Sequence, residues 1–208
     1  MVSPDKFISL AEKNGLILPM GAWVFKDVCR QIKKWNECAI TADMNVSINI
    51  SPKQFLRENL VERMKTAIAE NNIDPKQITI EITETTAIEN ADKTIDILNQ
   101  LKALGIKIAL DDFGTGYSSL IYLKKFPFDT IKIDKSFIQD ITIKAEAKEL
   151  VQTIISLAKN LNYKVVAEGV ESIEEVELLK TLGCDYFQGY FFSKPILPDE
   201  VNMYIKKY

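Results

Sequence analysis

The chain has 208 residues, of which 47% are hydrophobic and 26% are charged, and its formal net charge is -3. This composition suits one globular domain with a buried core, and the charge gives no general attraction to nucleic acid or anionic membranes. Histidine is absent, which excludes histidine metal clusters, Ser-His-Asp and Cys-His nucleophile systems, and phosphohistidine chemistry.

The cysteines and the apolar stretches indicate an intracellular setting. Cys29, Cys38 and Cys184 are odd in number and form no CxxC pair, so neither a disulfide framework nor a zinc site is expected. The apolar stretch over residues 15–25 is too short to span a bilayer and is interrupted by Pro19 and Gly21. With no signal-peptide layout before it, we expect reduced thiols, no membrane contact by this segment and a cytoplasmic location.

The first predicted elements are helices, followed by a regular alternation of strands and helices. Ser3 and Pro4 predict a helix start and Gly15 its end, and apolar residues at helical spacing predict a second helix over residues 22–38. Strands are expected at residues 44–51, 77–83, 106–111, 129–134, 163–168 and 186–190. Helices are expected at residues 52–71, 90–104, 119–125, 145–162 and 172–182. Boundary signals are Ser51-Pro52, a capping box from Ser172 to Glu175, and the glycines Gly105 and Gly183.

Six strands alternating with helices predict parallel βαβ units, hence an open doubly wound sheet or a closed barrel. Buried parallel strands normally have continuous apolar runs, whereas these strands alternate apolar and polar residues, as in Val46 to Asn49. The polar faces could line a barrel interior that opens into a site at the C-terminal ends of the strands. We therefore expect an α/β fold of the TIM-like (β/α) barrel type.

The strand ends carry the predicted chemistry. The last inward-facing positions are Asn49, Glu81, Asp111, Lys132, Glu168 and Gln188. Carboxylates gathered around one cation need neutralisation, and oxygen ligands without His or Cys select Mg²⁺ or Mn²⁺. Asp112 follows Asp111 directly; the two carboxylates should point to different sides, where they could bridge two metals or hold one metal and its water.

Two of these features have alternative interpretations. Taken alone, residues 111–116 fit an acidic strand end followed by a glycine turn equally well. Lys132 could be a salt-bridged core lysine, a Schiff-base lysine of an aldolase type, or a cation that holds water or a phosphate oxygen. Carboxylates on the neighbouring strands favour the last interpretation.

At these residues the chain resembles the EAL domain family. The matching segments, in order and spacing, are residues 2–8, 47–51, 81–84, 111–120, 132–134, 168–171 and 188–190. The resemblance implies a barrel enzyme that uses Mg²⁺ or Mn²⁺ to open cyclic di-GMP to linear pGpG. It implies metal ligation by Asn49, Glu81, Asp111 and Asp112, and catalytic roles for Lys132 and Glu168 in positioning or deprotonating the attacking water. Further support of the site or substrate is implied for Gln188, Asp134, Glu84, Gly114, Thr115 and Gly116, with Glu84 anchoring the loop that follows Asp112.

The chain also departs from the family. It has no Glu-Ala-Leu triplet, and the two strands that precede Val2 in the family, with a metal-ligating glutamate and a phosphate-binding arginine, are missing. We therefore expect residues 1–208 to form one EAL-like domain with about six of eight strands. Exposed barrel edges favour a homodimer or contact with an upstream domain of the same polypeptide, and activity of this chain alone should be low or absent.

Three functions are compatible with these residues. The first is a phosphodiesterase acting on cyclic di-GMP in its full-length context, with no nucleic acid polymer as partner. The second is an inactive EAL-like module that binds cyclic di-GMP or a protein partner, and the third is a Lys132 Schiff-base aldolase. Retention of every expected polar residue from Asn49 to Gln188 favours the first, and an aldolase would not need adjacent metal-binding carboxylates.

Overall fold

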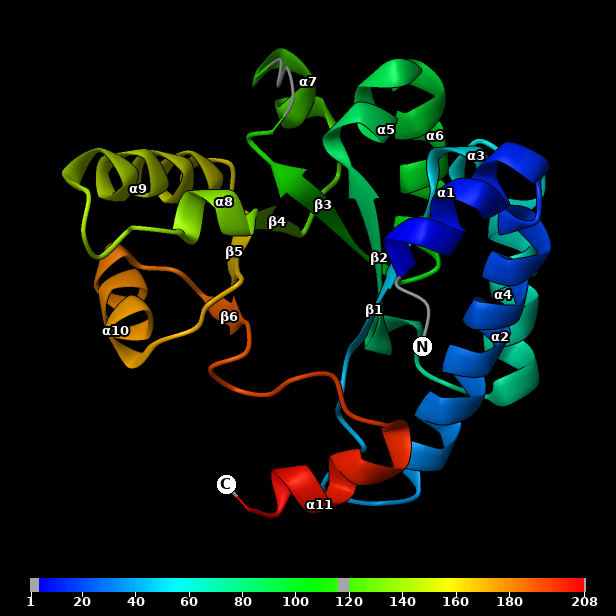
Figure 1. Ribbon diagram of the computed structural model, residues 1–208. Coiled ribbons are helices and arrows are strands. Elements are labelled where there is room, and N and C mark those ends of the chain that lie inside the picture. Colours follow the sequence, from blue (N-terminus) through cyan, green and yellow to red (C-terminus); the bar gives the residue numbers. More distant parts are fainter. Residues whose placement is uncertain (1–3, 116–119, 208) are drawn as a thin grey trace. The chain divides into compact units, whose positions relative to one another are not determined.

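The computed structural model describes residues 4–115 and 120–207 (Figure 1). The chain divides into two compact units. Unit 1 comprises Met1–Ile82 and Asn90–Lys107, and unit 2 comprises Thr83–Glu89 and Ile108–Tyr208.

Unit 1 is a pair of parallel strands with helices packed beside them. Its elements are α1 (Pro4–Asn14), α2 (Ile17–Asn36), β1 (Val46–Asn49), α3 (Pro52–Phe55), α4 (Leu60–Asn71), η1 (Pro75–Gln77), β2 (Ile78–Thr83) and α6 (Ala91–Ala103). Strands β1 and β2 pair in register from Val46 opposite Ile78 to Asn49 opposite Glu81. Helix α2 lies beside α4 (Figure 1), and its buried residues Phe25, Cys29 and Ile32 form much of its apolar face.

Two helix predictions in unit 1 are wrong in their boundaries. Helix α2 begins at Ile17 instead of residue 22, because Pro19 falls in its first turn, where a missing N–H costs no intrahelical hydrogen bond. The single helix expected over residues 52–71 is two helices, α3 and α4. The residue before α4, Asn59, has a left-handed backbone with φ of 66°, which a continuous helix does not allow.

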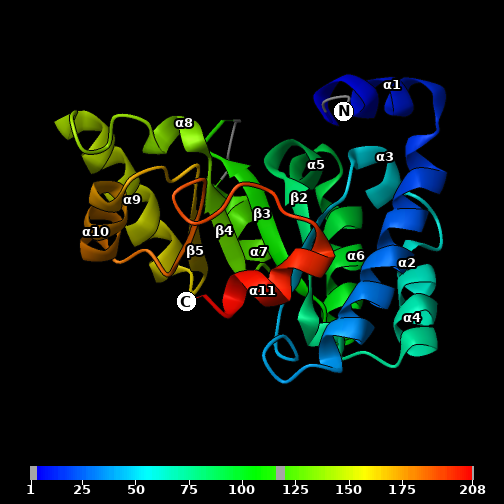
Figure 2. The same cartoon turned by 60° about the horizontal axis from the view of Figure 1, so that its bottom comes forward.

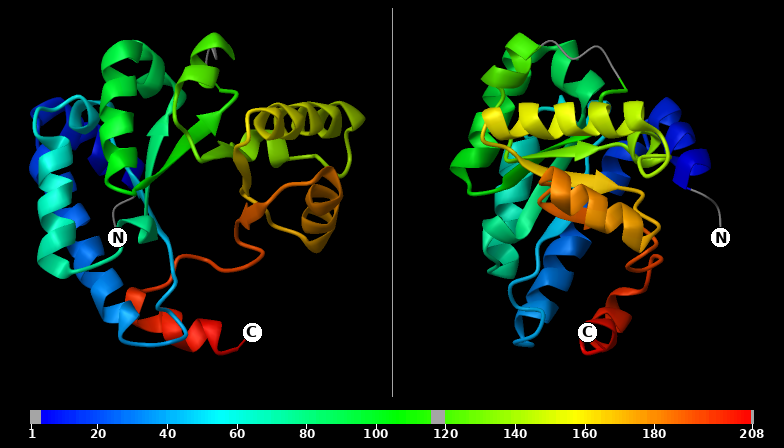
Figure 3. Two further views of the ribbon diagram at one scale, coloured as in Figure 1. Left: turned by 180° about the vertical axis from the view of Figure 1, so that it is seen from behind. Right: turned by 90° about the vertical axis from the view of Figure 1, so that its left-hand side faces the viewer.

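Unit 2 contains four parallel strands in sequence order. Its elements are α5 (Glu84–Glu89), β3 (Lys107–Phe113), α7 (Leu120–Lys125), β4 (Thr130–Ile133), α8 (Lys135–Ile138), α9 (Ala145–Asn160), β5 (Lys164–Glu168), α10 (Ile173–Leu182), β6 (Tyr186–Gln188), η2 (Pro198–Glu200) and α11 (Val201–Ile205). Strand β4 pairs with β3 and β5, and β6 pairs with β5. Helix α9 runs beside β4 and β5 (Figure 3).

In β2, β3 and β4 the predicted apolar face is buried, and much of the polar face is buried as well. Ile131 and Ile133 of β4 are fully buried, while Lys132 between them is 4% exposed. Glu81 of β2 is also 4% exposed. Buried charges of this kind need partners of opposite charge or hydrogen bonds close by. The groups around them therefore determine which chemistry the strand ends support.

Several local signals set the element boundaries as expected. The capping boxes Ser51–Gln54 and Ser172–Glu175 are both formed, and Gly183 ends α10 with φ of 87°. The short helices α5, α8 and α11 were not predicted, because four to six residues show too little periodicity. Cys29 and Cys184 are buried and Cys38 is half-buried. Among the described residues, no helix combines the length and apolar character needed to cross a bilayer.

Candidate active site

A bulge at the end of β3 brings two adjacent carboxylates to the same side. Leu110 lies opposite Ile131, but Phe113 lies opposite Ile133, so Asp111 and Asp112 together oppose the single residue Lys132. Asp112 adopts a left-handed backbone with φ of 52°. Two residues opposite one is the definition of a β-bulge, which bends the strand and redirects a side chain. The expectation that the two carboxylates point to different sides is therefore wrong.

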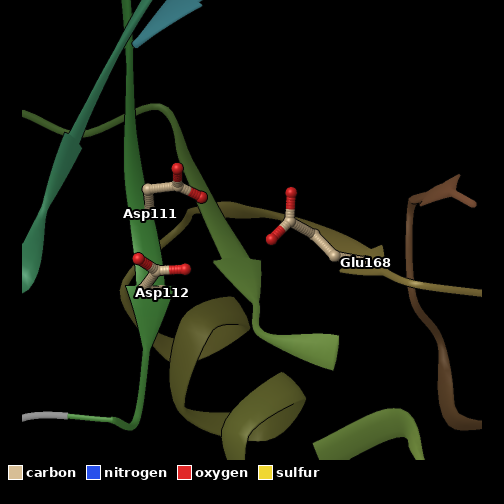
Figure 4. Close-up of side chains that lie close together, drawn as sticks. All are labelled: Asp111, Asp112 and Glu168. Carbon is tan, nitrogen blue, oxygen red and sulfur yellow. The ribbon is translucent and has the colours of Figure 1, made fainter. Parts of the chain in front are cut away.

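Three carboxylates from two strands meet at this bulge. One oxygen atom from each of Asp111, Asp112 and Glu168 lies within 4.8 Å of the others. Figure 4 shows the carboxyl groups of Asp111 and Asp112 on β3 directed toward that of Glu168 on β5. Asp111 is buried and the other two are half-buried. Carboxylate oxygens at this spacing suit a hard divalent cation.

Lys132 of β4, the strand between β3 and β5, pairs with carboxylates from both of those strands. Its Nζ lies 2.9 Å from Asp111 Oδ1 and 2.7 Å from Glu168 Oε1, and its side chain is 5% exposed. An ammonium group held between two carboxylates is a cation and not the free amine that a Schiff base requires. The geometry therefore favours an electrostatic role over the aldolase interpretation.

Asp111 Oδ1 is a buried carboxylate oxygen that lies in an ion pair with Lys132 and accepts no hydrogen bond from the residues that the structure describes. Within the described part of the chain, Asp111 Oδ1 has no hydrogen-bond partner, because its contact with Lys132 is an ion pair without hydrogen-bond geometry. A buried carboxylate oxygen without such a bond is costly. The residues present thus fit a metal site.

The loop after β3 is fastened by Glu84, which is 4% exposed. Glu84 Oε2 accepts a hydrogen bond from the Gly114 amide at 3.4 Å. Thr115 Oγ1 donates to the carbonyl oxygen of Asp112 at 2.8 Å, which closes a turn over the bulge. Gly114 has φ of 96°, and a Cβ there would come 2.8 Å from the Phe137 ring. The predicted residue Gly116 lies outside the described residues.

Asn49 and Glu81 lie in unit 1. They are register partners at the C-terminal ends of β1 and β2. Asn49 is exposed and Glu81 is buried. Their neighbouring positions agree with the expectation that adjacent strand ends carry polar side chains, and their metal ligation stays a prediction.

Asp134 and Gln188 lie at a cavity of about 550 Å³ in unit 2, which Glu168 also lines. Gln188 is the register partner of Glu168. Asp134 is the N-cap of α8 and accepts from the Ser136 amide at 3.0 Å. Partial burial acts to raise the pKa of Asp134, but hydrogen bonds from Ser136 and the nearby Lys135 outweigh it and lower that pKa.

The cavity contains cations that the sequence analysis did not single out. Lys135 and Lys194 line it beside Tyr190, and the Lys194 ammonium lies 6.0 Å from the centre of the Tyr190 ring. Lys135 directly follows the matching segment 132–134, and Lys194 lies near the end of the resemblance. Both could have been noted as local cations in a chain whose net charge is negative.

Residues 1–195 match the family model of the EAL domain. The chain belongs to the EAL domain family. This EAL domain is 40% identical over 201 residues to the bifunctional diguanylate cyclase/cyclic di-GMP phosphodiesterase MucR of Pseudomonas aeruginosa, covering 97% of the chain and 29% of the relative. It is 39% identical over 208 residues to the cyclic di-GMP phosphodiesterase PdeR of Escherichia coli, covering all of the chain and 31% of PdeR. The chain thus spans less than a third of either relative.

The solved structure of the MucR phosphodiesterase in complex with c-di-GMP resembles this EAL domain. The TM-score is 0.92 at 40% identity, covering 96% of this chain and 81% of that one. The likeness confirms the α/β fold class, an incomplete TIM-like barrel with six parallel strands among the described residues.

Proposed function

We propose that this EAL domain hydrolyses cyclic di-GMP to linear pGpG with the help of Mg²⁺ or Mn²⁺. The observation that carries the proposal is the cluster of Asp111, Asp112 and Glu168, in which Asp111 and Glu168 also pair with the ammonium group of Lys132. The names of MucR and PdeR and the c-di-GMP complex of MucR support the choice of substrate.

Asp111 and Asp112 would hold the metal, with Asn49 and Glu81 as further predicted ligands. The donors are oxygen atoms throughout, which suits Mg²⁺ and Mn²⁺ better than softer metals. When bound, such a metal lowers the pKa of a coordinated water and stabilises negative charge on phosphoryl oxygens.

Glu168 would deprotonate the attacking water, and Lys132 would hold Glu168 in position. Glu168 is half-buried and has a carboxylate that can accept a proton as water adds to a phosphorus atom. One P–O bond of the ring then breaks, and its oxygen atom takes up a proton to give linear pGpG. The Lys132 ammonium, 2.7 Å from Glu168, fixes that carboxylate and places a positive charge beside the phosphate.

The cavity next to Glu168 would receive part of the substrate. Its volume of about 550 Å³ lies within the range usual for small-ligand sites, roughly 300–1,000 Å³. Lys135 and Lys194 supply positive charge for a phosphate group, and the Tyr190 ring supplies an aromatic face for a base.

Product formation tests the proposal. The chain is incubated with cyclic di-GMP and Mn²⁺, Mg²⁺ or EDTA, and pGpG is quantified by liquid chromatography. We expect slow, metal-dependent formation of pGpG by this chain, and a fall of at least about 100-fold in Glu168→Gln. The matched control is Glu177→Gln, because Glu177 is an exposed residue of α10.

Two results would contradict the proposal. Turnover that is unchanged in Glu168→Gln would remove Glu168 from the chemistry. Binding of cyclic di-GMP without any pGpG in the presence of Mn²⁺ or Mg²⁺ would favour the inactive binding module instead.

A further inference from the structure

Unit 1 contains a second cavity, between α2, α3 and α4, which the proposed hydrolysis does not use. Its volume is about 50 Å³, above the roughly 10–15 Å³ that one water molecule needs. The three helices lie together in Figure 2. Buried residues Phe25, Met64 and Ala67 are part of a lining that is mainly apolar. The cavity therefore suits a compact apolar group.

One polar group is built into this apolar lining. Gln54 is 8% exposed, and its Oε1 accepts a hydrogen bond from the Ser51 amide at 3.1 Å. Its Nε2 fills the space over Gly21, where a Cβ would come within 1.3 Å of it. That NH₂ group donates no hydrogen bond to any residue within 4–115 or 120–207. An NH₂ donor at the wall of a cavity favours a ligand with an acceptor oxygen.

The rim of the cavity is positively charged. Lys26, Arg57 and Arg63 line it together with a single anion, Glu58, and all four are exposed. None of the three cations forms an ion pair with another residue that the structure describes. Their charge favours an anionic ligand, and arginine in particular matches the planar geometry of a carboxylate.

We propose that this cavity binds a small carboxylate that carries a compact apolar group. The apolar group would lie among Phe25, Met64 and Ala67, and the carboxylate would accept from Gln54 Nε2 and from the arginines at the rim. The proposal goes beyond the hydrolysis of cyclic di-GMP and does not depend on it.

Isobutyrate, whose apolar group is compact, is the probe that tests the proposal, and isobutyramide is its uncharged counterpart. Each is titrated into ¹⁵N-labelled protein while amide chemical shifts are followed. We expect saturable shifts at α2, α3 and α4 with isobutyrate, and binding at least about fivefold weaker with isobutyramide, as loss of a charge-assisted contact predicts.

Three variants distinguish specific binding in the cavity from a general attraction of anions to the protein surface. Ala22→Leu places a larger side chain at the half-buried lining residue Ala22 and should abolish the shifts. Arg63→Gln should weaken binding about two- to fivefold, the usual effect of one partly exposed charge. Lys33→Gln removes a charge from an exposed residue of the same helix α2, away from the lining residues, and should leave binding unchanged.

Three outcomes would overturn the proposal. The first is a shift that stays linear over the whole range of isobutyrate concentrations. The second is an equal loss of affinity in Arg63→Gln and Lys33→Gln, which would show nonspecific attraction of anions. The third is saturable binding of a glutamate-rich peptide with one valine when isobutyrate does not bind, which would assign the cavity to a protein partner. If Ala22→Leu does not fold, the comparison of ligand affinity between Arg63→Gln and Lys33→Gln still tests the proposal.

Discussion

Lys132 Nζ lies 2.7 Å from Glu168 Oε1, and its second ion pair, with Asp111 Oδ1, has a length of 2.9 Å. The side chains of Lys132, Asp111 and Glu168 are 5%, 11% and 16% exposed. Water therefore screens these charges only weakly. The same lysine thus contributes to the stability of the folded protein and to the proposed chemistry.

Replacing Lys132 by methionine should affect stability and turnover together. Removing one partner of a buried ion pair typically costs about 3–5 kcal/mol, so the free energy of unfolding in EDTA should fall by about that amount. Turnover should fall at least about 100-fold. Urea unfolding with EDTA or Mn²⁺ measures the first effect, and pGpG formation the second. Lys164→Met is the control, because Lys164 pairs with Asp185 at an exposed position. An equal loss of stability in both variants would contradict the importance of burial at Lys132.

Because Asp112 has a left-handed backbone, its replacement by alanine and by asparagine should differ in stability. Asn tolerates this conformation better than Ala, so Asp112→Ala should be about 1 kcal/mol less stable than Asp112→Asn. Both variants remove the same charge, and Mn²⁺ affinity should fall at least about tenfold in each. Urea unfolding and Mn²⁺ titration by calorimetry measure the two effects. Equal stability of the two variants would show that the bulge carries no backbone strain.

Gly114 should tolerate alanine less well than Gly15 does. Both have positive φ, 96° and 79°, but a Cβ on Gly114 would meet the Phe137 ring at 2.8 Å, whereas Gly15 has no neighbour within 4 Å. The backbone penalty of about 1–3 kcal/mol applies to both variants. Any additional loss of stability in Gly114→Ala is therefore due to the contact with Phe137. Thermal unfolding measures it, and Phe137→Leu combined with Gly114→Ala should recover part of the difference. Equal losses in the two single variants would exclude that contact.

Asp185 should make stability dependent on pH in the acid range. Partial burial acts to raise its pKa, but hydrogen bonds from Lys164 at 2.8 Å and the Val165 amide at 3.0 Å outweigh it, so the pKa lies below the ordinary value of 3.8 for an aspartate. A lowered pKa in the folded state gives stability that is present above pH 3.8 and is lost as pH falls through the folded-state pKa.

Asp185→Asn should therefore be about 1 kcal/mol less stable than the parent at neutral pH. The difference should shrink at a pH below the folded-state pKa. Urea unfolding at several pH values measures it, with Asp199→Asn as control for an exposed carboxylate. A difference that does not change with pH would contradict the assigned role of the Asp185 charge.

Cys38 should be the thiol that reacts readily in the folded protein. Burial raises the pKa of Cys29 and of Cys184 to about 11, so their thiolate forms are scarce at pH 8. Cys38 is only half-buried. Titration with a chromogenic disulfide reagent should label one thiol quickly in the native protein and all three in urea, and Cys38→Ser should remove the fast phase. Fast labelling that persists in Cys38→Ser would show that a buried thiol is accessible.

The sequence by itself predicted the positions of the six strands along the chain, their parallel connections and the polar strand ends of this EAL domain. These features follow from local patterns: a two-residue alternation places Lys132 beside buried Ile131 and Ile133, and a capping box such as that from Ser172 to Glu175 marks the start of a helix. The positions of Asp111, Lys132 and Glu168 at neighbouring strand ends could be predicted for the same reason.

Only the tertiary structure decided how those side chains meet. The bulge at Asp111 and Asp112 depends on the register between β3 and β4, which pairs residues distant in sequence. A two-residue period therefore predicted that the two carboxylates point to opposite sides of the strand, whereas the bulge brings them to the same side. The cavity beside Gly21 and Gln54 likewise requires α2 to pack on α3. Local periodicity fixes which face of an element is apolar, but strand register and helix packing fix which polar atoms face one another.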